Sequence, residues 1–396
     1  MVGEGEEKRH EQDPGNPIII AGEGPHSMRI GISCYSTFGG SGVVATEVGK
    51  ALAARGHEVH ILSPSVPPRL VGFEDRINFH EVRASPYPLF EDAPYSIALG
   101  SKMADVAEHY GLEIIHAHYA IPHAMAALLA RMAIPGLKVV TTLHGTDITV
   151  VGSDPSYLPM VKMAIRESDG VTAVSEYLRQ ETIRTFGVDR NIEVIGNFVE
   201  PPGLERPDCR AWLAPKAAFV LTHISNFRPV KRVVDVLKVF ERVRREVPAR
   251  LIMVGDGPDR LEAEAYCRDR GFAAEVRFTG KQLDIGTVLA CSDLFLLPSA
   301  TESFGLAALE AMGHRVPVIA SRVGGLPEVV RHGVDGYLEP MGDVEAMAAD
   351  AVKLLKDEDL RLTMGDAARD RALGTFAEGP IVDQYEALYR QVLGHA

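Results

Sequence analysis

From Met28 onward, the sequence alternates between short apolar runs and amphipathic stretches separated by turns. Residues 29–35 have the composition of a buried strand, and residues 43–55 have the apolar spacing of a helix that ends at Gly56. A second strand is expected at 57–63. Repeated strand–helix units of this kind predict an α/β fold with parallel, doubly wound sheets.

The alternation occurs in two series. Residues 64–94 interrupt the first series as a long proline-rich loop, and this series ends with a strand at 171–175. Residues 198–203 are rich in proline and glycine, which is typical of a linker between domains. The second series is expected to have strands at 218–225, 250–256, 275–280, 293–297 and 316–321.

A chain of 396 residues is too long for one ordinary core, and we expect two main domains. Residues 28–200 are predicted to form an N-terminal Rossmann-like domain and residues 201–378 a C-terminal one, with a cleft between them. Residues 379–396 are predicted to form a helix that packs back on the first domain. Residues 1–27 are polar, glycine-rich and mixed in charge, as in a disordered extension.

The charge balance restricts the partners. With 41 basic and 54 acidic residues, the net charge of −13 argues against nucleic acid or an anionic membrane as the main partner. No apolar run reaches the roughly 18 residues of a transmembrane helix. The four cysteines have no CxxC spacing, so neither a zinc site nor a disulfide framework is predicted, and a cytoplasmic location is expected. A homo-oligomer is compatible with the sequence, which does not determine the oligomeric state.

Two glutamates flank a predicted helix start after the buried run 293–298. Glu302 is expected in the strand-to-helix loop and Glu310 about two turns into the helix, so both can face one crevice. Free N–H groups at a helix start attract oxyanions, and carboxylates accept hydrogen bonds from sugar hydroxyls. The pattern suits a nucleotide sugar. The alternative is a glutamate that favours the helix dipole, followed by a solvated one.

Two further loops carry groups suited to a diphosphate. Gly39 and Gly40 follow the first strand, where small residues let the backbone approach a phosphate. The turn lacks GxGxxG spacing and no acidic residue ends the second strand, which disfavours a dinucleotide. Arg228 and Lys231 follow the first strand of the second series and are expected to clamp a diphosphate, whereas Arg232 is expected on a solvated helix face.

Histidines concentrate in the first series. His144 lies in a loop at a strand end, where ligands of such sheets bind. His116 and His118 alternate on one strand, a spacing that a metal site can use, but a packing role is favoured for His116 and His123. No acidic DxD cluster stands at a strand end, so no metal is expected.

Together these motifs resemble those of retaining glycosyltransferases of family 4, which have the GT-B fold of two Rossmann-like domains facing a cleft. The resemblance spans residues 28–396, and it is closest to the subgroup that begins bacillithiol biosynthesis. The motifs that carry it lie at 32–42, 79–82, 115–123, 141–149, 225–232, 254–258 and 302–310.

The resemblance implies a hexosyltransferase that moves N-acetylglucosamine from UDP-GlcNAc to the hydroxyl of L-malate, with retention and without metal or cofactor. It assigns catalytic roles to His144, Arg228, Lys231 and Glu302, and it implies that Glu310 holds the uridine ribose. The β-phosphate of the donor would serve as the base. The implied donor-binding residues are Gly39, Gly40, Asn226, Arg228, Lys231, Glu302, Ser303, Phe304, Gly305, Leu306 and Glu310.

Asn226 departs from the wider family, which commonly carries an arginine at this position; Arg228 can replace its function. Malate has two carboxylates, so the first domain must supply cations and hydroxyls. The residues favoured for the acceptor are Ser41, Tyr95, Tyr119, Thr146 and Lys162, and the other cations considered are Arg69, Arg83, Lys102 and Arg166.

Three other functions fit the same sequence features. One keeps the donor and changes the acceptor, for example to inositol phosphate. Another is an isomerase similar to UDP-GlcNAc 2-epimerases, which share a two-domain cleft. The third is a sensor that binds the sugar nucleotide without turnover.

Overall fold

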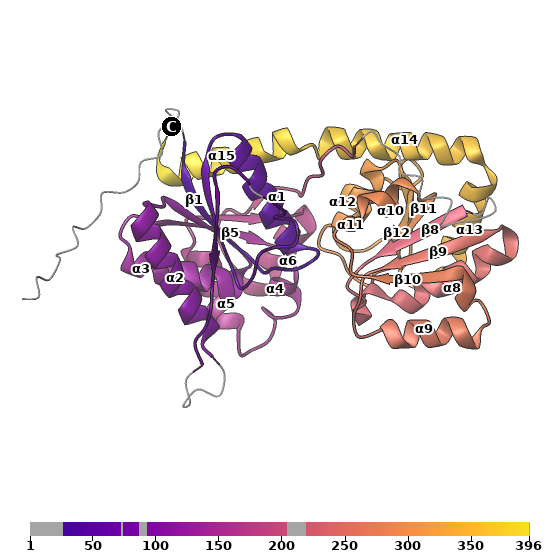
Figure 1. Ribbon diagram of the computed structural model, residues 1–396, viewed down its shortest axis with the longest axis horizontal. Coiled ribbons are helices and arrows are strands. Elements are labelled where there is room, and N and C mark those ends of the chain that lie inside the picture. Colours follow the sequence, from indigo (N-terminus) through magenta and orange to yellow (C-terminus); the bar gives the residue numbers. More distant parts are fainter. Residues whose placement is uncertain (1–26, 73, 87–92, 204–218, 396) are drawn as a thin grey trace, which may run out of the picture.

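The computed structural model describes residues 27–72, 74–86, 93–203 and 219–395. It contains two parallel sheets packed against helices, in two domains that lie side by side (Figure 1). This arrangement confirms the predicted α/β fold with two Rossmann-like domains. The predicted N-terminal extension, apart from its last residue, lies outside the described residues.

The N-terminal sheet has seven parallel strands in the order β3-β2-β1-β4-β5-β6-β7. The strand order reverses between β1 and β4, so the helices that follow these two strands diverge and leave a crevice at their carboxyl ends. The strands are β1 (Arg29–Ser33), β2 (Glu58–Ser63), β3 (Ile77–Glu81), β4 (Ile114–His118), β5 (Lys138–Leu143), β6 (Gly170–Ala173) and β7 (Glu193–Val194). The helices are α1 (Ser41–Ala54), α2 (Tyr95–Tyr110), η1 (Ala120–Ala124), α3 (Met125–Ala133), α4 (Thr146–Thr149), α5 (Leu158–Glu167) and α6 (Glu176–Phe186).

The prediction of a continuous loop at 64–94 is wrong, because β3 lies within this stretch. β3 is an edge strand that pairs only with β2 among the described strands. Four of its five residues are half-buried and the fifth is exposed, so it lacks the apolar run that marks the central strands.

The C-terminal sheet has six parallel strands in the order β10-β9-β8-β11-β12-β13, which places a second reversal between β8 and β11. The strands are β8 (Phe219–Ile224), β9 (Ala249–Val254), β10 (Val276–Gly280), β11 (Leu294–Leu297), β12 (Val318–Ser321) and β13 (Gly336–Glu339). The helical elements are η2 (Pro229–Lys231), α8 (Val233–Glu246), α9 (Arg260–Asp269), η3 (Ala273–Glu275), α10 (Gly286–Ala290), α11 (Leu306–Gly313), α12 (Leu326–Val329), α13 (Val344–Lys356) and α14 (Glu358–Thr375).

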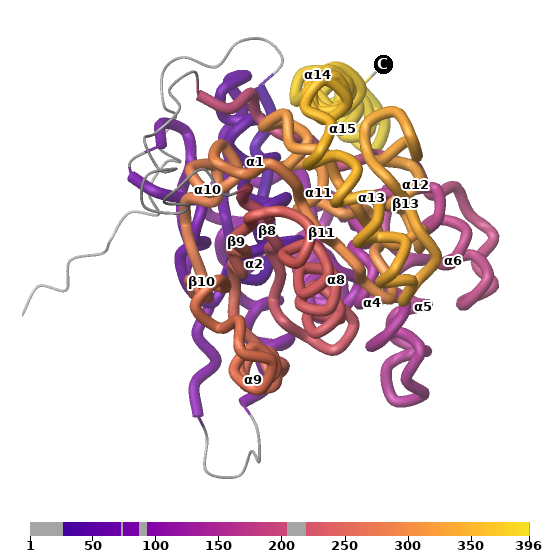
Figure 2. The backbone as a smooth tube through the Cα atoms, turned by 90° about the vertical axis from the view of Figure 1, so that its right-hand side faces the viewer, coloured from indigo at the N-terminus to yellow at the C-terminus, as the bar shows by residue number. Residues whose placement is uncertain are grey.

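The last helix, α15 (Glu378–Leu393), returns to the N-terminal domain, where it packs against α1, β5 and β6. Figure 1 shows α14 and α15 running one after the other along one edge of the molecule, and Figure 2 shows the two helices end-on at the same edge. Tyr385 and Tyr389 are completely buried, and the Tyr389 hydroxyl lies 2.7 Å from Nδ1 of His116. The chain thus crosses between the domains twice, and Val199 bridges Ala377 where the two crossings meet.

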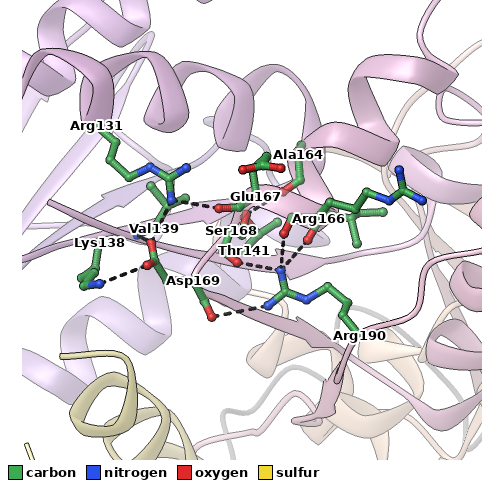
Figure 3. Close-up of polar contacts among 11 residues, drawn as sticks. Arg131, Lys138, Val139, Thr141, Ala164, Arg166, Glu167, Ser168, Asp169 and Arg190 are labelled. Carbon is green, nitrogen blue, oxygen red and sulfur yellow. Dashed lines mark hydrogen bonds and ion pairs between the residues drawn. The ribbon is translucent and has the colours of Figure 1, made fainter. Parts of the chain in front are cut away.

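Arg190 holds the C-terminal end of α5 (Figure 3). Its Nη1 donates to the carbonyl oxygens of Ile165, Arg166 and Ser168 at 2.7, 3.0 and 2.6 Å. The last carbonyls of a helix have no partners within the helix, so this guanidinium supplies the missing donors. The neighbouring Asp169 carboxylate accepts hydrogen bonds from the side chains of Arg131 and Lys138 and from the backbone N–H of Val139.

The described cysteines differ in their bonding. Cys34 and Cys267 are buried free thiols, and burial raises their pKa values to about 12 and about 11. Cys291 is disulfide-bonded, which the cysteine spacing did not predict. Within the described ranges, every helix is too short or too polar to span a membrane.

Candidate active site

A cavity of about 490 Å³ lies between the domains, beside the residues that link them. Each domain contributes one wall, formed mainly by α1 on one side and by α11 on the other. Charged side chains from both walls face this space, which therefore offers partners for a polar ligand. The charged lining residues are Glu47, Lys50, Arg69, Glu200, Asp284 and Glu310.

Lys231 and Glu302 lie together in the C-terminal domain. Glu302 is in the loop between β11 and α11, and its Oε1 lies 2.6 Å from Nζ of Lys231. The Ser299 hydroxyl donates to the same oxygen at 2.8 Å. The structure therefore brings the predicted phosphate-binding cation next to the predicted sugar-binding carboxylate. Arg228 and Asn226 are exposed in the loop after β8, which leads to Lys231.

Glu310 is the fifth residue of α11, so it lies just over one turn into the helix and not the two turns predicted. Burial raises the pKa of its carboxyl group, and the nearby Arg69 opposes this shift. Arg69 reaches across from the N-terminal domain to donate a hydrogen bond to Glu310 and lies 3.6 Å from Glu47. Arg69 was considered as a malate ligand, but the structure places it beside the predicted ribose site.

The residues between Glu302 and Glu310 shape the loop before α11 and its contacts with neighbouring elements. Gly305 has φ +100°, and a Cβ at this position would lie 2.6 Å from Leu326, so the turn requires glycine. Phe304 is buried and packs edge-on against Phe376. The carbonyl oxygen of Ser303 accepts a hydrogen bond from the Ser175 hydroxyl at 2.5 Å, across the two domains.

The glycine turn before α1 is open to ligands. Gly39 and Gly40 are exposed, Gly40 has φ +64°, and a Cβ at either residue would meet no atom within 4 Å. Gly42 differs, because its Cβ would lie 2.4 Å from the carbonyl oxygen of Tyr35. Leu306 lines the interdomain cavity at the start of α11.

Three predicted acceptor residues come together at the β1–β4 crevice. The Tyr119 hydroxyl lies 2.9 Å from Oγ1 of Thr146. Burial and the negative charge of Asp147 raise the pKa of Tyr119, whereas hydrogen bonds from Thr146 and Ser41 and the charge of Arg228 oppose this shift. The crevice therefore holds hydroxyl donors from the first domain close to a cation from the second.

Tyr95 and Lys162, the other two predicted acceptor residues, form no hydrogen bond with this hydroxyl cluster among the described residues. The Tyr95 hydroxyl is buried without a hydrogen-bond partner among the described residues, and burial raises its pKa to about 12. Its hydroxyl interacts electrostatically with Tyr35, whose ring packs edge-on against Tyr119 at 5.6 Å. Lys162 lies on α5, half-buried, and makes no hydrogen bond or ion pair within the described chain. Tyr35 was not predicted, although its place two residues after the end of β1 could have indicated it.

His144 borders the hydroxyl cluster. Its ring lies 5.4 Å from that of Tyr119, and its Nε2 lies 2.9 Å from Nδ1 of His118. Burial lowers the pKa of His144 to about 3, so the imidazole is neutral at neutral pH. His116 and His123 are fully buried. Both ring nitrogens of His116 have partners, with Nε2 lying 2.7 Å from the Thr142 hydroxyl and Nδ1 2.7 Å from the Tyr389 hydroxyl, and Nδ1 of His123 lies 2.7 Å from the Ser33 hydroxyl.

Two Rossmann-like domains, with cations and glycine turns at facing strand ends, define the GT-B class of glycosyltransferases. The family model of Glycosyltransferase Family 4 matches residues 38–201, and that of Glycosyl transferases group 1 matches residues 207–371. The chain is 46% identical over 371 residues to the N-acetyl-alpha-D-glucosaminyl L-malate synthase of Bacillus anthracis, covering 92% of this chain and 97% of that protein. The chain therefore belongs to the family 4 glycosyltransferases.

Two further likenesses agree with this membership. The D-inositol 3-phosphate glycosyltransferase of Mycobacterium bovis is 28% identical over 390 residues, or 90% of this chain and 79% of that protein. The structure of Anabaena Alr3699/HepE in complex with UDP and glucose superposes with a TM-score of 0.78 at 22% identity, covering 92% of this chain and all of that one. The second likeness shows the shared fold.

Proposed function

We propose that this enzyme transfers N-acetylglucosamine from UDP-GlcNAc to the hydroxyl of L-malate with retention, giving GlcNAc-α-malate and UDP, the first step of bacillithiol biosynthesis. The observation that carries the proposal is the 46% identity, over 92% of the chain, to a relative whose name states this product. The more distant inositol-phosphate enzyme supplies the alternative acceptor.

The donor would lie against the C-terminal domain. Glu310 would accept hydrogen bonds from the ribose hydroxyls, and Glu302 from the transferred sugar. Lys231 would then face the diphosphate while keeping its contact with Glu302, from which it lies 2.6 Å. Arg228 and the N–H groups of the glycine turn would add to the charge stabilisation, because fixed donors aimed at a developing anion are usually the largest catalytic contribution.

In the transfer step, the bond between the anomeric carbon and the diphosphate oxygen breaks while the malate oxygen bonds to that carbon on the same face. The malate hydroxyl proton passes to a β-phosphate oxygen of the leaving UDP. His144, neutral at neutral pH because burial lowers its pKa to about 3, would orient the sugar 6-hydroxyl. We propose no metal or cofactor, because Arg228 and Lys231 supply the cationic charge that a metal would otherwise contribute.

The acceptor would lie in the β1–β4 crevice. Ser41, Tyr119 and Thr146 offer hydroxyl donors there, and Arg228 offers a cation from the opposite domain. Carboxylates bind most strongly to charged or multiple donors, and malate carries two of them. The proposal therefore adds Arg228 to Lys162 as a cation for the acceptor.

The test is UDP release from UDP-GlcNAc across a panel of hydroxy acids and inositol 3-phosphate, with and without EDTA. Release with L-malate, unaffected by EDTA, and an α-linked product by proton NMR are the expected results. Preference for inositol phosphate would change the acceptor class. Conversion of the donor alone would indicate an isomerase, and tight UDP-GlcNAc binding without release would indicate a sensor.

The proposed substrates are small metabolites of the cytoplasm, so the proposal includes a cytoplasmic location. Every residue assigned above lies in a single chain, and the proposed site does not require a homo-oligomer.

A further inference from the structure

Asp147 is a buried carboxylate for which the proposed chemistry gives no role. It lies in α4 and is 1% exposed. Its Oδ1 accepts hydrogen bonds from the backbone N–H groups of Gly145 and His144 at 2.8 and 3.2 Å, and its Oδ2 accepts one from Ala120 at 3.2 Å. No cation of the described chain forms an ion pair with it. Burying a charge without a counterion is costly, and here three backbone donors offset that cost.

These hydrogen bonds tie together the ends of two neighbouring strands. Ala120 follows Tyr119 at the end of β4, and His144 follows the end of β5. Both chain segments have unusual backbone angles beside the bonded N–H groups, with φ +103° at Tyr119 and φ +124° at Gly145. A positive φ at a bulky residue persists only where the surroundings hold it. The Asp147 carboxylate bonds to both segments, and the contact between the ring nitrogens of His118 and His144 at 2.9 Å also joins them.

The same loop also contacts the donor side of the cleft. A Cβ at Gly145 would lie 1.6 Å from the Ser303 hydroxyl oxygen, so the backbone of the first domain packs directly on the loop between Glu302 and α11. Asp147 therefore fixes a segment that lies between the hydroxyl cluster and the donor loop.

We propose that Asp147 is a positioning residue for glycosyl transfer. It holds Tyr119 and His144 in fixed positions relative to each other and to the donor loop, which is the loop between Glu302 and α11. The inference rests on the proposed function for its readout. Asp147 acts through backbone N–H groups, so it need not touch either substrate. Its loss would disturb the relative placement of acceptor and donor, to which transfer rates are very sensitive.

The ionised carboxylate is the form that accepts all three bonds. Protonation places a hydrogen on one oxygen, which then faces N–H groups that cannot accept it. Burial raises the pKa of Asp147 to about 6, against the effect of the backbone hydrogen bonds. Transfer should therefore be lost as the pH falls through about 6.

The titratable and charged groups around Asp147 do not account for a change in this range. The pKa of His144 is held at about 3, and burial raises the pKa values of Tyr35 and Tyr119 above their ordinary value of 10. Arg228 faces Tyr119 from the other domain. Glu310, whose pKa is also raised by burial, lines the interdomain cavity where the ribose is proposed to bind, so its titration should alter UDP binding.

The experiment compares Asp147→Asn with Asp169→Asn. Asp169 accepts a backbone N–H bond from Val139 at the opposite end of the same sheet, so it is a matched structural control (Figure 3). UDP release is measured from pH 5 to 9 with the acceptor that the wild-type enzyme uses best, and UDP affinity is measured by calorimetry. We expect Asp147→Asn to lower kcat about 100-fold and to change UDP affinity less than threefold. Its pH profile should also lose the acidic limb, which is the fall in kcat below about pH 6 expected for the wild type.

Asp169→Asn should keep the wild-type pH profile, even if its melting temperature falls. An Asp147→Asn enzyme with wild-type kcat, or with the acidic limb retained, would overturn the inference. If this variant does not fold, the wild-type profile decides: a kcat that stays constant down to pH 5 would overturn it too. Absence of any transfer by the wild-type enzyme is a separate outcome, which would refute the proposed function.

Discussion

The ammonium group of Lys231 lies 2.6 Å from the Glu302 carboxylate, which also accepts a hydrogen bond from the Ser299 hydroxyl. Two residues proposed to contact opposite sides of the bond that breaks are thus joined directly to each other. The carboxylate holds the cation in place, and a fixed cation costs little reorganisation when negative charge develops beside it.

Removal of this cation should slow the chemical step. We expect Lys231→Ala to lower kcat by about 100- to 1000-fold, comparable to the loss of a donor from an oxyanion hole. Lys231→Arg retains the charge with different geometry and should be affected less. Steady-state UDP release measures both variants, and equal activities of Lys231→Ala and the wild type would contradict the assignment.

Glu310 and Glu302 should separate binding from turnover. We expect Glu310→Ala to weaken UDP binding by roughly 1.5 to 3 kcal/mol, because it removes hydrogen bonds to a charged acceptor. Glu302→Ala should leave UDP affinity nearly unchanged and lower turnover, because its proposed contact is with the sugar. Calorimetry with UDP alone provides the comparison. An unchanged UDP affinity in Glu310→Ala would refute the ribose contact.

Domain closure should depend on Glu328. This C-terminal-domain carboxylate accepts hydrogen bonds from the backbone N–H groups of Glu176 and Tyr177, both at 2.8 Å, and so caps α6 of the other domain. We expect UDP-GlcNAc to reduce the radius of gyration of the wild-type protein, and to reduce that of Glu328→Ala less. Small-angle scattering provides the measurement. Glu345→Ala, which removes a surface ion pair within one domain, is the control and should behave like the wild type.

Arg190 should matter for stability and not for transfer. Its guanidinium bonds to three carbonyl oxygens at the end of α5 (Figure 3). This end of α5 comes just before β6 begins, so it lies at the opposite end of the sheet from the carboxyl strand ends that form the cleft. We expect Arg190→Ala to lower the free energy of unfolding by about 2 kcal/mol, measured by denaturant titration. Arg190→Lys can reach fewer carbonyls and should be intermediate. A loss of activity in folded Arg190→Ala at low temperature would contradict this role.

The central strands could be predicted because parallel strands covered on both faces need continuous apolar runs, as in β8, β9 and β11. The edge strand β3 lacks such a run, so its residues resemble a loop. Spacing along one helix placed Glu310 only to within a turn, since the helix start depends on the backbone at Gly305.

Contacts between distant residues could not be predicted in the same way. Arg69 and Glu310 are separated by 241 positions, and only the packing of one domain on the other brings them together. Asp147 lies in a motif that the sequence reveals, but its partners are backbone N–H groups, which leave no trace in side-chain identity.

The return of α15 to the first domain limits how the enzyme can move. Because Val199 donates a backbone hydrogen bond to Phe376, the outgoing and returning segments are paired where they pass between the domains. The paired segments form a hinge, so the easiest motion is a rotation of one domain that opens the far side of the cleft. Sliding or twisting of one domain against the other would break this pairing. A protease cut within residues 198–203 would accordingly leave both halves of the active site attached through the second segment.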